Sequence, residues 1–141
     1  MLDQTDRQIL TLLQANSRLK IKDMAEAVHL TAPAVTARLQ KMEEQGVIQR
    51  YTVELNRHQT GCMVHVLVLV TLTEGNHQSY KDYVSRFAYH VDRHYRIAGN
   101  GCYHLEMYFE KIEDLSHFLD GLERYASYQV STVVNFIAFD D

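Results

Sequence analysis

Residues 1–50 repeat apolar side chains at three- and four-residue steps in three consecutive segments. That spacing places the apolar side chains of each segment on one face of an α-helix. The positions are Ile9, Leu10 and Leu13, then Ile21, Met24, Ala25 and Val28, then Val35, Leu39 and Met42. Three helices with a tight connection between the last two predict a helix-turn-helix unit.

Polar residues, a proline and a glycine stand where the ends of these helices should lie. Asp3 can cap the first helix, and Asp6 adds a negative charge to its first turn, where the helix dipole favours it. Thr31 can cap the third helix, and Pro33 falls in its first turn, where a missing N–H costs nothing. Gly46 is placed to end that helix.

After Gly46 the pattern changes to alternation of polar and apolar residues. The stretch "VIQRYTVELN", residues 47–56, predicts a strand that forms a small wing or a linker. The following "RHQTGC", residues 57–62, marks a boundary. We therefore predict a helix-turn-helix domain at residues 1–50, a strand and linker at 51–62, and a second domain at 63–141.

The second domain begins with a strand that is apolar at nearly every position. This stretch, "MVHVLVLVTLT", is rich in β-branched residues, so both of its faces should be buried. A helix follows that carries Tyr80, Tyr83, Val84 and Phe87 on one face. Next, "VDRHYRIA" and "CYHLEMYFE" flank an Asn100-Gly101 pair, and Asn-Gly is a strong hairpin signal.

A second helix and a last strand complete the predicted order βαββαβ. The helix "IEDLSHFLDGLERY" should point five apolar residues inward: Ile112, Leu115, Phe118, Leu119 and Leu122. The strand "QVSTVVNFIAF" closes the chain. This order predicts an α+β fold in which a winged helix-turn-helix precedes a ferredoxin-like plait, with two helices on one face of an antiparallel sheet.

The other face of that sheet should be apolar as well. Leu67 and Leu69 alternate with valines in the first strand, and the last strand is apolar on both faces as far as Phe139. Because a large wet apolar face is unfavourable, something must cover it. A second copy of the sheet is the simplest cover and gives a twofold dimer. The alternative is that the N-terminal helices fold back over the sheet.

Charge divides the chain in a similar way. Residues 1–60 hold eight Lys and Arg against seven Asp and Glu, whereas residues 61–141 hold six against eleven. The basic first part indicates a polyanion as one possible partner. No apolar run approaches the ~20 residues that cross a bilayer, and no leader pattern opens the chain, so we expect a cytoplasmic protein without a membrane partner. Two cysteines are too few for a disulfide framework and are expected to be buried thiols.

The third helix has the width of a DNA major groove and belongs to the basic part of the chain. Its expected outward residues are Pro33, Ala37, Gln40 and Glu44, with Thr36 and Lys41 beside them. The predicted DNA-binding set is Arg18, Lys20, Lys22, Thr31, Thr36, Ala37, Arg38, Gln40, Lys41 and Arg50. Ala37 and the Thr36 methyl suit thymine methyl groups, and Gln40 suits a base or a phosphate. The cations suited to phosphates are Arg18, Lys20, Lys22, Lys41 and Arg50. With few bidentate donors facing outward, modest sequence preference is expected, assisted by DNA shape.

Other chemistries find little support in the sequence. A hairpin with Asn100 and Gly101 as its loop would pair Ile97 with His104 and separate His94 from His104 by roughly 10 Å, which is too far for one metal ion. We therefore expect no metal site and no cofactor. No phosphate-cradling loop or nucleophile elbow is present, so an enzyme is not expected.

Three segments carry a resemblance to a known family. "LDQTDRQILTLLQANSRL", "LTAPAVTARLQKMEEQGVIQRYTVELN" and "YRIAGNGCYHL" together resemble the Lrp/AsnC family of transcription regulators, especially its LrpC-type members, whose hairpin also ends in a Cys-Tyr pair. The resemblance spans nearly the whole chain. It implies binding to double-stranded DNA, a homodimer formed through the plait, assembly of dimers to an octamer, and a small-molecule effector near the turn of the hairpin.

The turn departs from the family pattern. Family members that bind an amino acid carry a Gly-Asp-x-Asp pattern, whereas this chain has Gly99, Asn100, Gly101 and Cys102 there. Without carboxylates an α-ammonium group lacks its usual partner. The candidate effector residues are Ala98, Gly99, Asn100, Gly101, Cys102 and Tyr103, and we expect them to bind either another metabolite or nothing. Two functions remain: a transcription regulator, or an architectural protein that bends or wraps DNA.

Overall fold

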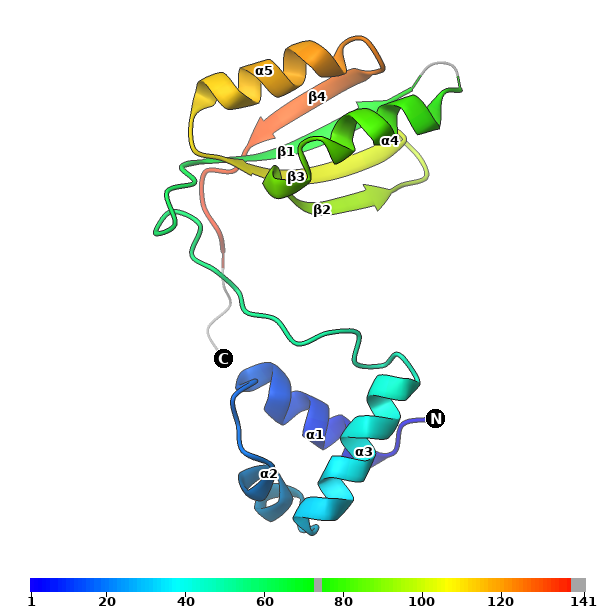
Figure 1. The fold of residues 1–141 in the computed structure, drawn as a ribbon, viewed down its shortest axis with the longest axis vertical. Coiled ribbons are helices and arrows are strands. Elements are labelled where there is room, and N and C mark those ends of the chain that lie inside the picture. The colour runs from blue at the N-terminus through cyan, green and yellow to red at the C-terminus, as the bar shows by residue number, and fades with distance from the viewer. Residues whose placement is uncertain (73–74, 138–141) are drawn as a thin grey trace. The chain divides into compact units, whose positions relative to one another are not determined.

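The computed structural model describes residues 1–72 and 75–137. The chain divides into two compact units, unit 1 spanning Met1–Glu54 and unit 2 spanning Leu55–Asp141 (Figure 1). Unit 1 is helical and unit 2 holds a four-stranded sheet with two α-helices. The α+β architecture is therefore the predicted one.

Unit 1 consists of α1 (Gln4–Ala15), α2 (Ile21–Val28) and α3 (Ala32–Glu44). The predicted apolar stripes meet in its core: Ile9 of α1, Met24 of α2 and Val35 of α3 are almost completely buried. Ile48, just beyond α3, packs against the same core. The helical spacing in the sequence thus identified the interior of unit 1.

The predicted caps are present. Asp3 accepts a hydrogen bond from the backbone N–H of Asp6 at 2.8 Å, and the Asp6 carboxylate accepts one from the N–H of Asp3 at 3.1 Å. The Thr31 hydroxyl oxygen accepts a hydrogen bond from the Ala34 N–H at 3.4 Å. Between α2 and α3, His29 has a left-handed backbone with φ of 58°, which closes α2 in the space of one residue. These local features fix the tight connection of the helix-turn-helix.

The strand predicted within residues 47–56 is not formed. Tyr51, Val53 and Leu55 keep the alternating pattern, but their side chains are exposed and the backbone belongs to no sheet. A strand needs a neighbour for its backbone hydrogen bonds, and no other described segment of the chain pairs with this one. The Tyr51 hydroxyl instead donates to the Glu43 carboxylate at 2.6 Å, which ties this segment to the end of α3 and raises the pKa of Tyr51 to about 12.

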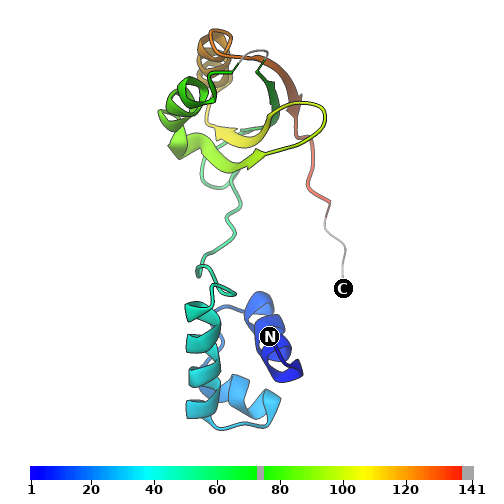
Figure 2. The same ribbon diagram turned by 90° about the vertical axis from the view of Figure 1, so that its right-hand side faces the viewer.

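Unit 2 has the predicted βαββαβ order. Its elements are β1 (Val64–Thr71), α4 (His77–Ser85), the short 3-10 helix η1 (Ala88–His90), β2 (Val91–Arg96), β3 (Tyr103–Phe109), α5 (Ile112–Leu122) and β4 (Ser127–Thr132). The sheet is antiparallel, with strand order β2-β3-β1-β4. Figure 2 shows α4 and α5 on the same side of the sheet. This is the ferredoxin-like plait expected from the sequence.

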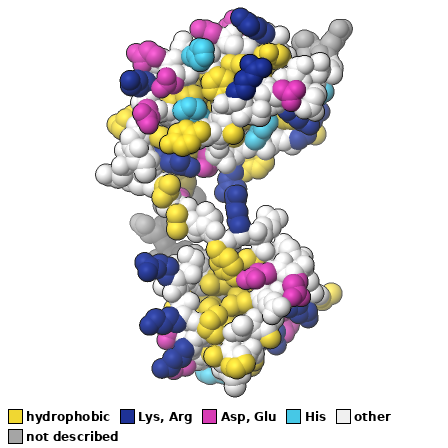
Figure 3. Space-filling view, in the orientation of Figure 1, with side chains coloured by type: hydrophobic (Ala, Val, Ile, Leu, Met, Phe, Trp, Pro, Cys, Tyr) yellow, Lys and Arg dark blue, Asp and Glu magenta, His cyan; other side chains and the backbone are white. Residues whose placement is uncertain are grey.

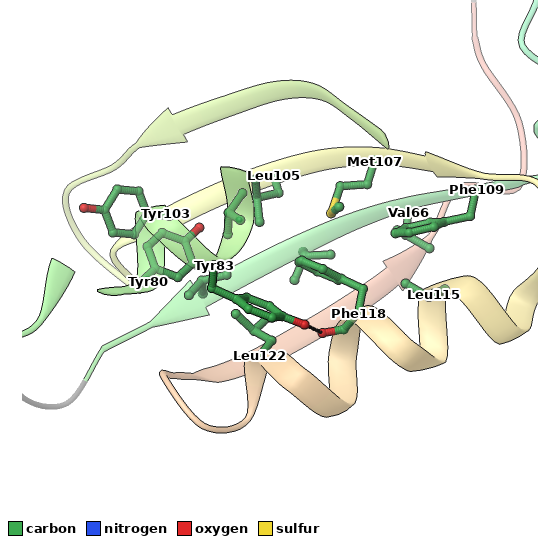
Figure 4. Close-up of a cluster of buried hydrophobic side chains, with 13 residues drawn as sticks. Val66, Tyr80, Tyr83, Tyr103, Leu105, Met107, Phe109, Leu115, Phe118 and Leu122 are labelled. Carbon is green, nitrogen blue, oxygen red and sulfur yellow. Dashed lines mark hydrogen bonds between the residues drawn. The ribbon is translucent and has the colours of Figure 1, made fainter. Parts of the chain in front are cut away.

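The core of unit 2 lies between the helices and the sheet (Figure 4). Val66, Val68 and Val70 of β1 point into it and are completely buried, as is Phe118 of α5. Ile112 was predicted to face the same core, but its side chain is 60% exposed. It is the first residue of α5, so it precedes the turn of the helix that reaches the sheet.

The helix-free face of the sheet is more polar than predicted. Pairing places Leu67 beside Glu106 of β3 and Ser131 of β4, and Leu69 beside His104 and Gln129. Both leucines are half-buried. The face therefore has a small apolar centre, Leu67 and Leu69, within a polar surround rather than the continuous apolar surface that the sequence suggested.

The last strand also ends earlier than predicted. β4 stops at Thr132, opposite Val66, close to the point where β1 begins. The Val133 N–H still donates to the His65 oxygen of β1 at 2.8 Å, but the described chain after it belongs to no strand, and Val134 and Phe136 are 95% and 75% exposed. Phe139, predicted to extend the helix-free face, lies outside the described residues.

Candidate DNA interface and effector turn

The outer face of α3 consists of small or polar side chains. Six residues are exposed there, as the helical period predicts: Pro33, Thr36, Ala37, Gln40, Lys41 and Glu44. On the inner face Val35, Leu39 and Met42 are buried. The helix therefore presents a narrow surface from which a partner can approach the backbone closely.

Two outward side chains already have partners within the helix. The Thr36 hydroxyl donates to the backbone oxygen of Ala32 at 3.0 Å, and the Gln40 amide donates to the Glu44 carboxylate at 2.8 Å. Thr31 uses its hydroxyl oxygen for the cap. These hydrogen bonds reduce the number of polar side-chain groups on α3 that are free to bind bases without rearrangement.

Five predicted cations are exposed: Arg18, Lys20, Lys22, Lys41 and Arg50. None forms an ion pair with a carboxylate of the described residues. Lys20 and Lys22 lie together at the start of α2, whereas Lys41 belongs to α3 and Arg50 follows it. Figure 3 shows basic side chains along the edge of unit 1. Such unpaired surface cations suit contacts with phosphates.

Arg38 differs from the other cations in the predicted set. Its Nη1 lies 2.6 Å from the Asp3 carboxylate and 2.8 Å from the Asp6 carboxylate, so it joins α3 to the start of α1. The Asp6 N–H and then Arg38 lower the pKa of Asp3 below its usual value. Arg38 is therefore ion-paired, unlike the five exposed cations, and it connects α3 to the start of α1 within unit 1.

We expect Arg38→Ala to lower the stability of unit 1 more at pH 7 than at pH 2. The folded pKa of Asp3 is lowered, so its ion pair stabilises the fold above the unfolded pKa of about 3.9 and is lost as the pH falls through the folded pKa. Thermal unfolding followed by helical circular dichroism measures the difference. Arg50→Ala, an exposed cation without an ion pair, is the control and should match the parent chain at both pH values. An equal loss from Arg38→Ala at both pH values contradicts the ion-pair role.

The turn between β2 and β3 is held against the end of β1. The Cys102 N–H donates to the Val70 oxygen at 2.7 Å, and the Ile97 N–H donates to the Cys102 oxygen at 3.0 Å. Gly101 has φ of 98°, and a Cβ there would stand 2.7 Å from Leu69 Cδ1. Only glycine satisfies both the backbone angle and this close approach.

The hairpin register differs from the prediction. Ile97 lies opposite Cys102 and Tyr95 opposite His104, whereas the sequence suggested that Ile97 faces His104. A two-residue type I′ loop needs positive φ at both Asn100 and Gly101, but the positive angles occur at Gly99 and Gly101. The loop is therefore longer, and the pairing shifts by two residues.

This register also changes the geometry of the histidines. His94 pairs with Leu105 on the helix side of the sheet, and His104 pairs with Leu69 on the helix-free side. The two imidazoles therefore lie on opposite faces of the sheet, and not far apart on the same face as predicted. Among the described residues no group of three or more His, Cys, Asp or Glu side chains could hold a metal ion. Cys62 is buried and Cys102 half-buried, both as free thiols.

Beside the turn lies a cavity of about 500 Å³ that the sequence did not predict. It opens on the helix side of unit 2, between α4 and β2, and Lys81, His94 and Arg96 are among its lining residues. No local sequence pattern predicts these lining residues, because the cavity forms only where α4 packs against β2.

No helix in the described ranges is long and apolar enough to cross a membrane.

Comparisons with known proteins agree with both units. A family model described as winged helix-turn-helix DNA-binding matches residues 2–49. The chain is 37% identical over 134 residues to the HTH-type transcriptional regulator LrpA of Bacillus subtilis, covering 95% of this chain and 98% of that protein. It is 32% identical over 139 residues to LrpC of the same bacterium, covering 99% and 94%. Both relatives are named as regulators and not as enzymes.

Solved structures give the same result. The structure of B. subtilis LrpC superposes with a TM-score of 0.91 at 28% identity, covering 99% of each chain. A transcriptional regulator of Neisseria meningitidis, solved as a complex with L-Met, superposes with a TM-score of 0.84 at 24% identity, covering 99% of this chain and 94% of that chain. At that identity the second likeness concerns the fold alone.

Proposed function

The chain belongs to the Lrp/AsnC family of DNA-binding transcriptional regulators, and we propose that it binds duplex DNA through α3 with modest sequence preference. The observation that carries this proposal is the exposed outer face of α3 together with the unpaired cations of unit 1. The proposal places this activity in the cytoplasm.

In the proposed complex α3 enters the major groove. Ala37 and the Thr36 methyl contact thymine methyl groups, because the Thr36 hydroxyl is already bonded to Ala32. The Gln40 amide gives up its hydrogen bond to Glu44 and contacts a base or a phosphate instead. Thr31, at the start of the helix, lies beside the phosphate backbone, and Arg38 contributes by holding α3 against α1.

Phosphate contacts come from Arg18, Lys20, Lys22, Lys41 and Arg50 in this proposal. They fix the position of α3 in the groove without reading the sequence. Since α3 offers no free arginine for bidentate guanine contacts, discrimination rests in part on the shape and bendability of the DNA.

Two substitutions test this division of roles. Lys41→Ala should weaken binding to all sequences alike and reduce the slope of log affinity against log salt by about 1. Gln40→Ala should change the ranking of sequences only slightly. Both are measured by fluorescence anisotropy on several duplexes across a salt series, with Gln78→Ala, on the exposed face of α4, as the control. Loss of binding to a single preferred duplex on Gln40→Ala alone would refute the scheme.

An architectural role is the second candidate, because the outer face of α3 has few free groups for reading bases. Footprinting over several promoters at one salt concentration separates the two functions. Discrete protected sites support a regulator of defined promoters. Extended, phased protection over most of the DNA supports bending or wrapping instead.

Unit 2 provides the dimer in our proposal. Leu67 and Leu69 form an apolar centre on the helix-free face, and the surrounding polar side chains can pair across a twofold axis. Two copies packed through this face bring two α3 helices to one DNA molecule. Further assembly of four dimers to an octamer is part of the same proposal.

We also propose that the turn from Ala98 to Tyr103 takes part in effector binding. The Neisseria relative in complex with L-Met illustrates an amino acid bound by this fold. In this chain the turn has an amide and a thiol, Asn100 and Cys102, where the family pattern has carboxylates. An amino acid held through its ammonium group is therefore not the expected effector.

A further inference from the structure

The cavity between α4 and β2 combines an apolar wall with a polar rim. Val84 and Tyr103, both almost completely buried, and the half-buried Val91 supply the wall. The Tyr103 ring packs against the tilted ring of Tyr80 with centroids 4.5 Å apart, at the end of the core next to the β2–β3 turn (Figure 4). A volume of about 500 Å³ suits a small organic molecule.

The rim carries two cations. Lys81 of α4 and Arg96 of β2 line the cavity, and no Asp or Glu within residues 1–72 and 75–137 does so. Neither cation forms an ion pair with a carboxylate of the described residues. Positive charge that no described carboxylate pairs with therefore faces this cavity. Figure 3 shows exposed apolar atoms on this side of unit 2, with basic, acidic and His side chains among them.

Arg96 is held in place before any ligand arrives. Its Nη1 donates to the Cys102 oxygen at 2.6 Å, and its Cζ lies 5.0 Å above the centre of the Tyr103 ring. These two contacts hold the guanidinium beside the cavity and leave its other N–H groups for an acceptor. Such a preorganised fork matches the geometry of a carboxylate.

His94 adds a neutral donor to the same rim. Tyr80 is completely buried, and its hydroxyl lies 3.0 Å from His94 Nε2. Because Nε2 is the only partner of this hydroxyl among the described residues, we assign Tyr80 as the donor and Nε2 as the acceptor, which places the imidazole proton on Nδ1. Burial, and then the charge of Lys81, lower the pKa of His94 and keep it neutral at pH 7.

We propose that this cavity binds a small organic carboxylate that has an apolar body and no ammonium group, such as a 2-oxo acid. The carboxylate lies between Arg96 and Lys81, and the apolar body packs on Val84, Val91 and Tyr103. This site deepens the proposed function, since Arg96 and Tyr103 connect it to the effector turn. An effector role for this ligand rests on the proposed DNA-binding function. Binding of the carboxylate to the cavity does not depend on that function.

The described lining residues include no acid, which makes the proposed site selective against amino acids. An ammonium group bound here would stand next to two cations without a carboxylate to offset them. Desolvating a charge beside like charges is unfavourable, so an amino acid should bind more weakly than the 2-oxo acid of the same side chain.

Matched pairs of ligands test the proposal on the full chain. Phenylpyruvate and 4-methyl-2-oxopentanoate are titrated by isothermal calorimetry beside phenylalanine and leucine. At least one oxo acid should bind about tenfold or more tightly than its amino acid, the scale expected for one charge-assisted contact. Equal binding within both pairs, or binding of neither oxo acid, overturns the proposal.

Substitutions locate the binding in this cavity. Lys81→Gln and Arg96→Gln should each weaken the oxo acid about tenfold. Lys81 is exposed and bonds to no described side chain, so its change does not threaten folding. Lys111→Gln, an exposed cation just before α5 that does not line the cavity, is the control. Unchanged affinity in Lys81→Gln and Arg96→Gln overturns the assignment.

DNA binding of the same samples is measured without ligand. Intact DNA binding with no oxo-acid binding counts against the cavity proposal alone. Oxo-acid binding with no DNA binding counts against the proposed function alone.

Discussion

A chain carrying Leu67→Lys and Leu69→Lys should be monomeric and should bind a duplex with two sites roughly a hundredfold more weakly than the parent chain. The two leucines are the apolar centre of the helix-free face and lie two residues apart on β1. In a twofold dimer the substitution places four lysines at the interface, where they repel one another and lose water. In the monomer, binding of one α3 no longer raises the effective concentration of a second α3 at the neighbouring site.

Sedimentation velocity gives the oligomeric state, and anisotropy with one-site and two-site duplexes gives the affinity. Gln78→Lys with Ser116→Lys adds the same charge on exposed positions of α4 and α5 and should leave both measurements unchanged. Binding to a one-site duplex should be nearly equal in both variants. A dimer that persists in the leucine variant, or a parent chain that is already monomeric, contradicts the proposed pairing of the sheets.

Features that depend on neighbouring residues could be predicted from the sequence. The Asp3 and Thr31 caps, the three helices of unit 1 and the βαββαβ order all depend on spacings within one turn or one strand. The strand predicted within residues 47–56 and the extended last strand were wrong for a shared reason. Alternation shows that a segment can be a strand, but a partner strand decides whether it becomes one.

The candidate sites follow the same distinction. The outward residues of α3 follow from the helical period, whereas the contact of Arg38 with Asp3 joins residues 35 positions apart. The hairpin register depends on Gly101 packing against Leu69, which no local pattern reports. The helix-free face was predicted to be apolar because the sequence alone does not show which residues of β3 and β4 lie beside Leu67.

Gly121→Ala should destabilise unit 2 by about 2 kcal/mol, although alanine normally favours a helix by about 1 kcal/mol. Gly121 lies within α5, and a Cβ there would overlap the Tyr83 hydroxyl and stand 2.7 Å from Cζ of that ring. The ring cannot move away easily. Its hydroxyl donates to the Phe118 oxygen at 2.7 Å, and the ring packs between Phe87 and Tyr125 at centroid distances of 5.2 and 5.1 Å.

Urea unfolding followed by circular dichroism measures this loss, and Gly75→Ala is the matched control. A Cβ at Gly75 meets no atom within 4 Å, so its effect should stay within about 0.5 kcal/mol. Tyr83→Phe removes the overlapping hydroxyl, so in its presence Gly121→Ala should cost less than it does alone. Equal costs with and without the hydroxyl would mean that Tyr83 is not what requires glycine at position 121, because the overlap predicts an energetic coupling between the two residues.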